Sequence, residues 1–241
     1  MSTTSRRNFL FASSGAFAGS LLVPGADAAQ EAPDSLYAES GLITGTPKPV
    51  RHREIPGFLS AAQVAPHHTA HYGGALKVFM GIEKQFEEQF AKTKVLDAAA
   101  FETLQRQKSS RGNSVILHEL YFDGLALKAN DPAPAIRSAI EKRFGSIEKW
   151  ADDFLASAKA AAGWAMLVVH PVNGRLYNLI SDEHAHGPLW MSVPLVVIDT
   201  YEHAFYIDYQ NRKADYAQKF LQFIDWSEAN RRFQSVTKQP K

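Results

Sequence analysis

The sequence predicts an α+β fold, in which an N-terminal helical hairpin domain precedes a small, about three-stranded antiparallel sheet packed with helices. Two patterns predict it. Apolar residues recur at helical spacing through the first half of the chain, whereas apolar and polar residues alternate from Trp164 onward, as they do in strands. The 241 residues are 45% hydrophobic and 21% charged, which is a composition that can bury a substantial core.

The first 28 residues have the pattern of an export signal. Arg6 and Arg7 stand directly before an Asn-Phe-Leu triplet, and an apolar run to Val23 precedes Ala26-Asp27-Ala28. The run is too short, and too rich in glycine and serine, to span a bilayer stably. Because the paired arginines resemble a twin-arginine signal, we expect export to the periplasm by that route in the folded state, with no membrane association after cleavage.

The charge of the remaining chain is balanced. Without residues 1–28, 24 basic and 24 acidic residues are left. This balance suggests neither a nucleic acid nor an anionic membrane as a partner. The chain contains no cysteine, so any metal ion must be held by histidine, aspartate or glutamate.

The elements before residue 130 form the predicted helical half. Residues 29–58 are rich in proline and poor in apolar clusters, which predicts an extended arm. From Leu59 to Lys94 the apolar spacing predicts helix, weakened locally at Gly73-Gly74. A second helix is predicted around residues 113–127, so residues 59–130 are expected to form the N-terminal helical domain.

Residues 131–241 are expected to form the C-terminal α/β domain. The stretch 131–162 predicts two helices, in which Gly145 caps the end of the first and Ser146 caps the start of the second.

The strands follow this pair of helices. Residues 164–181 alternate in polarity and carry the turn-forming dipeptide Asn173-Gly174, which predicts a hairpin. The apolar run VPLVVID at residues 193–199 predicts a third strand. The tail from Glu202 to Phe233 returns to helical spacing.

Four histidines and one acid are the candidate chemical groups. His67 and His71 are four residues apart and share one helix face, and His118 lies on an apolar helix face. Asp199 ends the third predicted strand, and His203 follows four residues later. Each residue alone is more often a hydrogen-bonded core or surface residue, or a helix cap. Together, in a chain without cysteine, imidazoles and a carboxylate suit iron, manganese or zinc.

The run from Asp199 to Tyr206, Asp-Thr-Tyr-Glu-His-Ala-Phe-Tyr, resembles the C-terminal motif of the iron/manganese superoxide dismutases, Asp-x-Trp-Glu-His-Ala-Tyr-Tyr. The similarity extends to Leu59–His71, to LHELYFDGL around His118 and to Ile224–Phe233, and so covers nearly everything after the arm. It implies one iron or manganese ion per subunit. The ligands that it implies are His67, His118, Asp199 and His203.

The resemblance also implies roles around the metal. Glu202 matches an acid that reaches the ligand histidine of the partner subunit, and His71 with Tyr206 matches a pair that hydrogen-bonds across a homodimer interface. Either His184 or His186 matches the residue that hydrogen-bonds the metal-bound solvent. His71, Tyr206 and His184 are therefore the expected catalytic residues, and a homodimer is expected.

Several positions depart from the family pattern. Ala75 stands where the family places a tyrosine at the mouth of the substrate funnel. In an α-helix Tyr72 would point away from the face of His67, unless Gly73-Gly74 distorts the helix. The other departures are Tyr201, Met166 and Phe122 at tryptophan positions, Leu117 at an asparagine position, and Pro66 directly before a ligand.

The function that the resemblance implies is disproportionation of superoxide to O₂ and H₂O₂ by metal redox cycling. One alternative is a scaffold that acts on a larger organic substrate, such as an aromatic one, by redox or lyase chemistry through a funnel opened at Ala75. A second alternative is a non-catalytic metal-binding protein. The sequence does not decide between iron and manganese, which use the same ligands.

Overall fold

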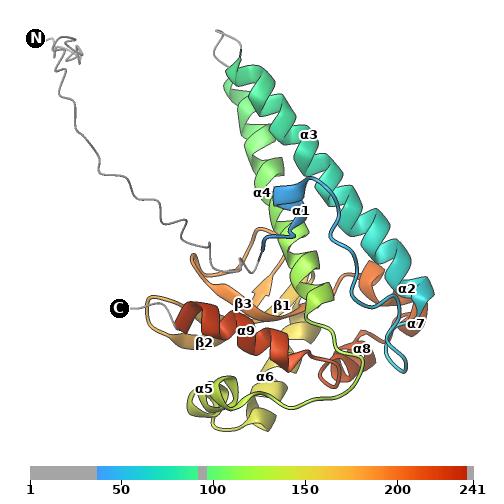
Figure 1. Cartoon of the computed structure of the whole chain (residues 1–241), viewed down its shortest axis with the longest axis vertical. Helices are drawn as coiled ribbons and strands as arrows, with labels where there is room; N and C mark the ends of the chain where they lie inside the picture. The colour runs from blue at the N-terminus through green and yellow to red at the C-terminus, as the bar shows by residue number, and fades with distance from the viewer. Residues whose placement is uncertain (1–36, 92–96, 238–241) are drawn as a thin grey trace, which may run out of the picture. The chain divides into compact units, whose positions relative to one another are not determined.

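The computed structural model describes residues 37–91 and 97–237, all of them within one compact unit, Leu36–Lys241. The predicted signal segment 1–28 lies outside the described residues. A helical hairpin followed by a three-stranded antiparallel sheet with helices confirms the predicted α+β class (Figure 1). The predicted domain boundary at residue 130 stays a prediction.

The arm is not wholly extended. It contains a short helix, α1 (Gly41–Thr44), which begins after Ser40 and ends at Gly45 in the left-handed conformation, with φ 71°. The backbone N–H of Gly41 donates to Oε1 of Glu119 at 2.8 Å, so α1 is tied to the long helix α4 (Ala98–Asp123) beside it (Figure 1). The sequence prediction missed α1 because four residues are too few to show a helical period.

The hairpin is built from two helical arms that lie side by side in Figure 1. The first arm runs without a break through α2 (Ala61–Pro66), a π-helix η1 (His67–Tyr72) and α3 (Gly73–Phe90), as expected from residue 59 onward. The second arm is α4 (Ala98–Asp123). Its predicted start at residue 113 was wrong, because the first half of α4 is mostly exposed and carries little apolar periodicity.

The two predicted helices after the hairpin are α5 (Pro134–Phe144) and α6 (Ile147–Ala160). Gly145 ends α5 with φ 94°, a conformation that glycine adopts without strain. The hydroxyl of Ser146 accepts a hydrogen bond from the backbone N–H of Lys149 at 3.2 Å and so caps α6. Both predicted caps are confirmed.

The sheet has the strand order β2-β1-β3, and both pairs are antiparallel. Its strands are β1 (Trp164–His170), β2 (Arg175–Ser181) and β3 (Val193–Asp199). The hairpin between β1 and β2 turns through a four-residue loop that ends at Gly174, with φ 64°. Trp164 lies opposite both Ser181 and Asp199, so one end of the sheet gathers these three residues.

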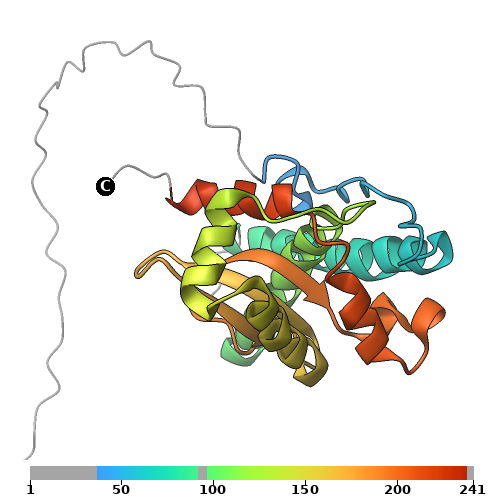
Figure 2. The ribbon, with the colours of Figure 1, turned by 90° about the horizontal axis from the view of Figure 1, so that it is seen from below.

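Alternation along β1 directs its side chains to two layers of the fold. Trp164 contacts His118 of α4, with ring centroids 5.0 Å apart. On the other face, Asn178 of β2 accepts a hydrogen bond from Trp150 of α6 at 3.1 Å. Figure 2 shows the same elements from below, where α5 and α6 are nearest the viewer. The α4 face of the sheet is therefore the face that carries the candidate site.

The C-terminal tail is helical in four pieces rather than one. They are the 3₁₀-helix η2 (Glu202–Ala204), α7 (Tyr206–Tyr209), α8 (Lys213–Phe220) and α9 (Trp226–Thr237). Among the described residues, no helix is both long enough and apolar enough to span a bilayer.

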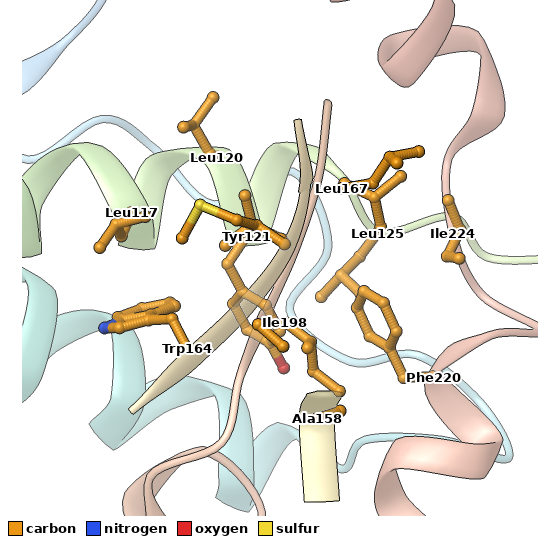
Figure 3. Close-up of a cluster of buried hydrophobic side chains, with 14 of the residues drawn as sticks. Leu117, Leu120, Tyr121, Leu125, Ala158, Trp164, Leu167, Ile198, Phe220 and Ile224 are labelled. Carbon is orange, nitrogen blue, oxygen red and sulfur yellow. The ribbon is translucent and has the colours of Figure 1, made fainter. Parts of the chain in front are cut away.

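The core joins α4, the sheet and α8. Figure 3 shows Tyr121 of α4 among Trp164, Ile198 and Phe220, all of which are buried. The hydroxyls of Tyr121 and Tyr216 lie 3.0 Å apart, so each of these buried groups has the other as its hydrogen-bond partner. This packing holds α4 against the sheet and so places His118 opposite Asp199.

Candidate metal centre

The four predicted ligand residues come from four elements and meet in one place. His67 belongs to η1, His118 to α4, Asp199 to the end of β3 and His203 to η2. One potential donor atom from each residue lies within 4.8 Å of the other three. Oδ2 of Asp199 lies 3.0 Å from Nε2 of His67, 3.2 Å from Nε2 of His203 and 3.7 Å from Nε2 of His118.

These separations fit a shared metal ion. Two donor atoms that are each about 2.1 Å from an ion and 90–120° apart are about 3.0–3.6 Å from each other. The three distances from Asp199 Oδ2 fall in or next to that range. Three imidazoles and one carboxylate also form a donor set that iron and manganese accept.

The orientation of His118 supports the same interpretation. Its Nδ1–H donates to the backbone oxygen of Ser114 at 2.7 Å, which leaves Nε2 of the neutral ring with a lone pair. That Nε2 is buried and has no hydrogen-bond partner among the described residues. A buried acceptor without a partner is costly, so His118 fits a residue that coordinates an ion.

Burial keeps the imidazoles of His118 and His67 neutral. It lowers the pKa of His118 to about 3. Burial also lowers the pKa of His67, although the hydrogen bond with Asp199 opposes this. Only a neutral imidazole can coordinate a metal, so both residues are competent ligands at neutral pH.

Asp199 stays ionised in the same cluster. Burial by itself raises the pKa of its carboxyl group, but the hydrogen bonds with His203 and His67 outweigh burial and hold the pKa below its ordinary value. Oδ1 accepts a hydrogen bond from the backbone N–H of Tyr201 at 2.9 Å, and Oδ2 is the oxygen that faces the three histidines. The buried centre therefore presents one negative charge to a cation.

The π-helix η1 orients the histidines of the first arm. His67 is buried with its ring 5.0 Å from the ring of His203, whereas His71 is exposed and stacks on His203 at 3.7 Å with an interplanar angle of 12°. His71 therefore lies against a ligand residue and faces outward. Its predicted catalytic role stays a prediction.

Tyr72 does not point away from the site. The i→i+5 bonding of η1 brings the fifth residue after His67 near the same face, which an α-helix would not do. The ring of Tyr72 lies 6.3 Å from that of His118. Its hydroxyl, however, donates to Oε1 of Glu119 at 2.8 Å and accepts from the backbone N–H of Lys48 at 2.7 Å. Tyr72 therefore anchors the arm and does not replace the family's funnel tyrosine.

Of the two candidate solvent partners, His184 faces the centre. Its ring lies 6.4 Å from that of His118, and its Nδ1 accepts from Nε1 of Trp164 at 2.8 Å. The neutral ring then carries its proton on Nε2, which is free to donate. His186 is exposed and lies 3.6 Å from the carboxylate of Glu183. His184 is therefore the one of the two that lies beside His118, and its role as the partner of metal-bound solvent stays a prediction.

The loop that carries His184 has an unusual backbone. Glu183 and His184 have positive φ values of 52° and 60°, and Gly187 has φ 106°. A Cβ atom at Gly187 would stand 2.1 Å from the backbone oxygen of Ile180, so only glycine fits there. A tight turn, rather than regular structure, presents His184.

The predicted interface residues are all at the surface. Glu202 is exposed, and Tyr206 is 50% exposed beside Ile207 at 56%. With His71 these residues are accessible to a second subunit.

Aromatic side chains line the ligands where the family pattern has tryptophan. Tyr201 stacks on His203 with ring centroids 5.3 Å apart, and Phe122 lies 4.8 Å from His67. Ala75, at the position of the family's funnel tyrosine, is only 4% exposed and belongs to the hydrophobic core.

Sequence reasoning missed two buried polar residues that support the centre. Nε2 of Gln63 donates to the backbone oxygen of His203 at 2.6 Å, and its Oε1 accepts from the N–H of Ile207 at 2.9 Å. Glu119, next to the ligand His118 in the sequence, accepts hydrogen bonds from the backbone N–H of Gly41 and from the hydroxyl of Tyr72. Neither residue stands in a motif, because both act across long sequence separations.

Comparisons with known proteins agree with this geometry. Residues 132–232 match the family model described as iron/manganese superoxide dismutases, C-terminal domain. The superoxide dismutase [Fe] of Cupriavidus metallidurans is 35% identical over 183 residues, which cover 75% of this chain and 91% of that protein. That of Aquifex aeolicus is 34% identical over 184 residues, with 75% and 86% covered. Superoxide dismutase [Mn] 2 of Haloferax volcanii is 29% identical over 191 residues, with 79% and 94% covered.

Proposed function

Because the chain belongs to the iron/manganese superoxide dismutase family, we propose that it disproportionates superoxide to O₂ and H₂O₂ with one iron or manganese ion per subunit. The observation that carries this proposal is the cluster of three histidine Nε2 atoms around Oδ2 of Asp199. The metal, when bound, supplies the one-electron redox chemistry that oxidises one superoxide and reduces the next.

The protein's part is to hold the ligands and to keep their protonation correct. His118 is oriented by the backbone oxygen of Ser114, and Asp199 by the backbone N–H of Tyr201. The lowered pKa values described above keep the imidazole of His118 neutral and the carboxylate of Asp199 ionised. His118 presents an unprotonated Nε2 to a cation, whereas Nε2 of His67 and of His203 would release the proton shared with Asp199 when a cation binds, so binding releases protons.

His184 is the proposed hydrogen-bond donor to solvent at the centre. Trp164 occupies its Nδ1, so Nε2–H remains as a donor on a ring close to His118. A neutral donor of this kind orients solvent without adding charge. Proton supply to the second superoxide is expected to depend on that oriented solvent.

The alternatives predict different outcomes from dismutation. A scaffold for a larger organic substrate, or a metal-binding protein without catalysis, would hold metal and leave superoxide unchanged. The three relatives described above are superoxide dismutases by name and cover most of this chain, which supports dismutation.

The test is metal analysis combined with a dismutation assay on purified protein. We expect close to one iron or manganese ion per chain and rapid dismutation. Asp199→Ala should lower metal content about tenfold, because it removes one ligand and the hydrogen-bond partner of two others. Asp131→Ala, at a 93% exposed carboxylate, is the matched control. A fully metallated wild type that does not dismutate superoxide would refute the proposal.

A homodimer is the proposed assembly. His71, Glu202 and Tyr206 are exposed beside the metal centre, where a second subunit would reach the ligand His203. Glu202→Ala should weaken association and metal affinity together, whereas Asp131→Ala should change neither. Sedimentation of the wild type as a monomer at micromolar concentration would contradict this assembly.

Export to the periplasm through the twin-arginine route is also proposed, on the sequence of residues 1–28. Changing Arg6 and Arg7 to lysine together should leave the precursor in the cytoplasm, because the paired guanidinium groups are the element that the signal resembles. Fractionation of cells that express each form measures this. Normal periplasmic accumulation of the double variant would exclude the route.

A further inference from the structure

The side chain of Gln63 bridges two backbone groups of the segment that carries the ligand His203. Gln63 belongs to α2 and is fully buried. Its Nε2 donates to the backbone oxygen of His203 at 2.6 Å, and its Oε1 accepts from the backbone N–H of Ile207 at 2.9 Å. One carboxamide therefore pairs with one acceptor and one donor of the same segment.

These two backbone groups are four residues apart, which is the spacing of a hydrogen bond in an α-helix. An uninterrupted helix would join the N–H of Ile207 directly to the oxygen of His203. Instead the chain forms two short helices, η2 and α7, which are separated at Phe205 with φ −144° and ψ −15°. The carboxamide of Gln63 stands in the place of the helical bond and holds the segment open between a ligand and the exposed residues that follow it.

A second contact joins α7 to α2 beside it (Figure 1). The carboxylate of Asp208 accepts hydrogen bonds from the backbone N–H and from the hydroxyl of Ser60, both at 2.7 Å. Ser60 caps the start of α2, three residues before Gln63. This contact involves no atom of His203, so the junction of the two helices and the placement of the ligand can be tested separately.

The same helical arm also meets the ring of His203. His67 follows Gln63 by four residues, and its ring centroid lies 5.0 Å from that of His203. His71 stacks on His203 at 3.7 Å. The first arm therefore contacts His203 at its backbone and at its ring. With both held, the direction of Nε2 of His203 toward Oδ2 of Asp199, 3.2 Å away, is fixed.

We propose that Gln63 is a positioning residue whose carboxamide, inserted between the backbone groups of His203 and Ile207, sets the direction from which His203 reaches the metal. Without the carboxamide, both groups would lose their partner, which costs free energy. Bonding to each other would remove that cost, and the continuous helix that results would turn His203 relative to Asp199. The proposal rests on the metal centre proposed above and not on the reaction.

The test compares the iron-loaded wild type with iron-loaded Gln63→Met, which keeps a side chain of similar length without the amide. Competition with a chelator measures affinity, and Gln63→Met should bind iron at least about ten-fold more weakly, as is typical when a residue that orients a ligand is lost. The electron paramagnetic resonance spectrum of the bound iron(III), which reports the arrangement of its ligands, should change.

Ser60→Ala is the matched control. It loosens the junction of α2 and α7 by removing the hydroxyl contact with Asp208, and it leaves every contact of Gln63 with His203 in place. Its stability should fall, whereas its iron affinity and its spectrum should be those of the wild type. A residue that merely stabilised the junction would not produce this difference between the two variants.

A second variant and a measurement on the wild type guard against a variant that does not fold. Gln63→Asn keeps the amide but is one methylene shorter, so it cannot hold both backbone groups, and it should change the spectrum in the same way. It decides if Gln63→Met fails to fold, as judged by circular dichroism. Hydrogen–deuterium exchange of the iron-loaded wild type, read at single residues, should show a protected N–H at Ile207.

Three outcomes would overturn the proposal. The first is a wild-type spectrum in the folded Gln63 variants. The second is an equal change in Ser60→Ala, because Gln63 would then act only on the junction of the two helices. The third is an N–H at Ile207 that exchanges as fast as a free amide. Iron-loaded wild type that does not dismutate superoxide would refute the proposed function alone, since none of these measurements uses activity.

Discussion

Removing the hydroxyl of Tyr72 should loosen the arm from the helices that carry the metal ligands. Tyr72→Phe keeps the buried ring, so no cavity forms, and it changes only the polar contacts. The lost contacts are the hydrogen bond to Oε1 of Glu119 at 2.8 Å and the one from the N–H of Lys48 at 2.7 Å. Glu119 keeps its bond from Gly41.

The expected loss of stability follows from these two contacts. A hydrogen bond to a charged carboxylate contributes about 1.5–3 kcal/mol, and a backbone N–H left without a partner costs about 1–3 kcal/mol. Lys48 is only partly buried, so its share lies at the lower end. The free energy of unfolding should fall by about 3 kcal/mol. For a chain of this size, that lowers Tm by roughly 6–12 °C.

Urea and thermal unfolding, followed by circular dichroism, measure this change. Tyr177→Phe is the matched control, because its hydroxyl accepts one exposed hydrogen bond from Asn173, and we expect it to cost less than about 0.5 kcal/mol. A double-mutant cycle with Glu119→Gln should show coupling between the two residues. A Tyr72→Phe protein as stable as the Tyr177→Phe protein would refute the reasoning. Metal content at 25 °C should stay unchanged, since no ligand is altered.

Three further outcomes are expected. Gly187→Ala should lower the free energy of unfolding by roughly 2–4 kcal/mol and slow dismutation, because its Cβ would stand 2.1 Å from the backbone oxygen of Ile180 and displace His184. A variant with the Tm and the dismutation rate of the wild type would contradict this. Ala75→Tyr should lower the free energy of unfolding by about 1–3 kcal/mol, because Ala75 is buried. The rate of dismutation per bound metal ion should stay the same or rise, and a tenfold lower rate would contradict this. In the metal-free protein, His118 by itself should lower the free energy of unfolding by about 2 kcal/mol between pH 7.5 and 5. The folded pKa of His118, about 3, lies below its unfolded value of about 6.5, so acidification favours the unfolded state. Urea unfolding at both pH values measures this, and a His118→Gln variant with the same pH dependence would contradict it.

The sequence was sufficient wherever a short local pattern carried the information. The two arms of the hairpin, the caps at Gly145 and Ser146, and the three strands follow from apolar spacing and turn residues. The spacing of Asp199 and His203 within one motif indicated half of the metal centre. Where the pattern was weak, as in the exposed first half of α4, the boundary was wrong.

The sequence by itself determined the fold class and the family, and through the family the four candidate ligands, because hydrophobic period and motif spacing are properties of neighbouring residues. Only the tertiary structure brought His67 and His118 within coordination distance of Asp199, and placed His184 rather than His186 beside His118. These features depend on contacts between segments far apart in the chain and on strained loop backbone, and neither leaves a local period in the sequence.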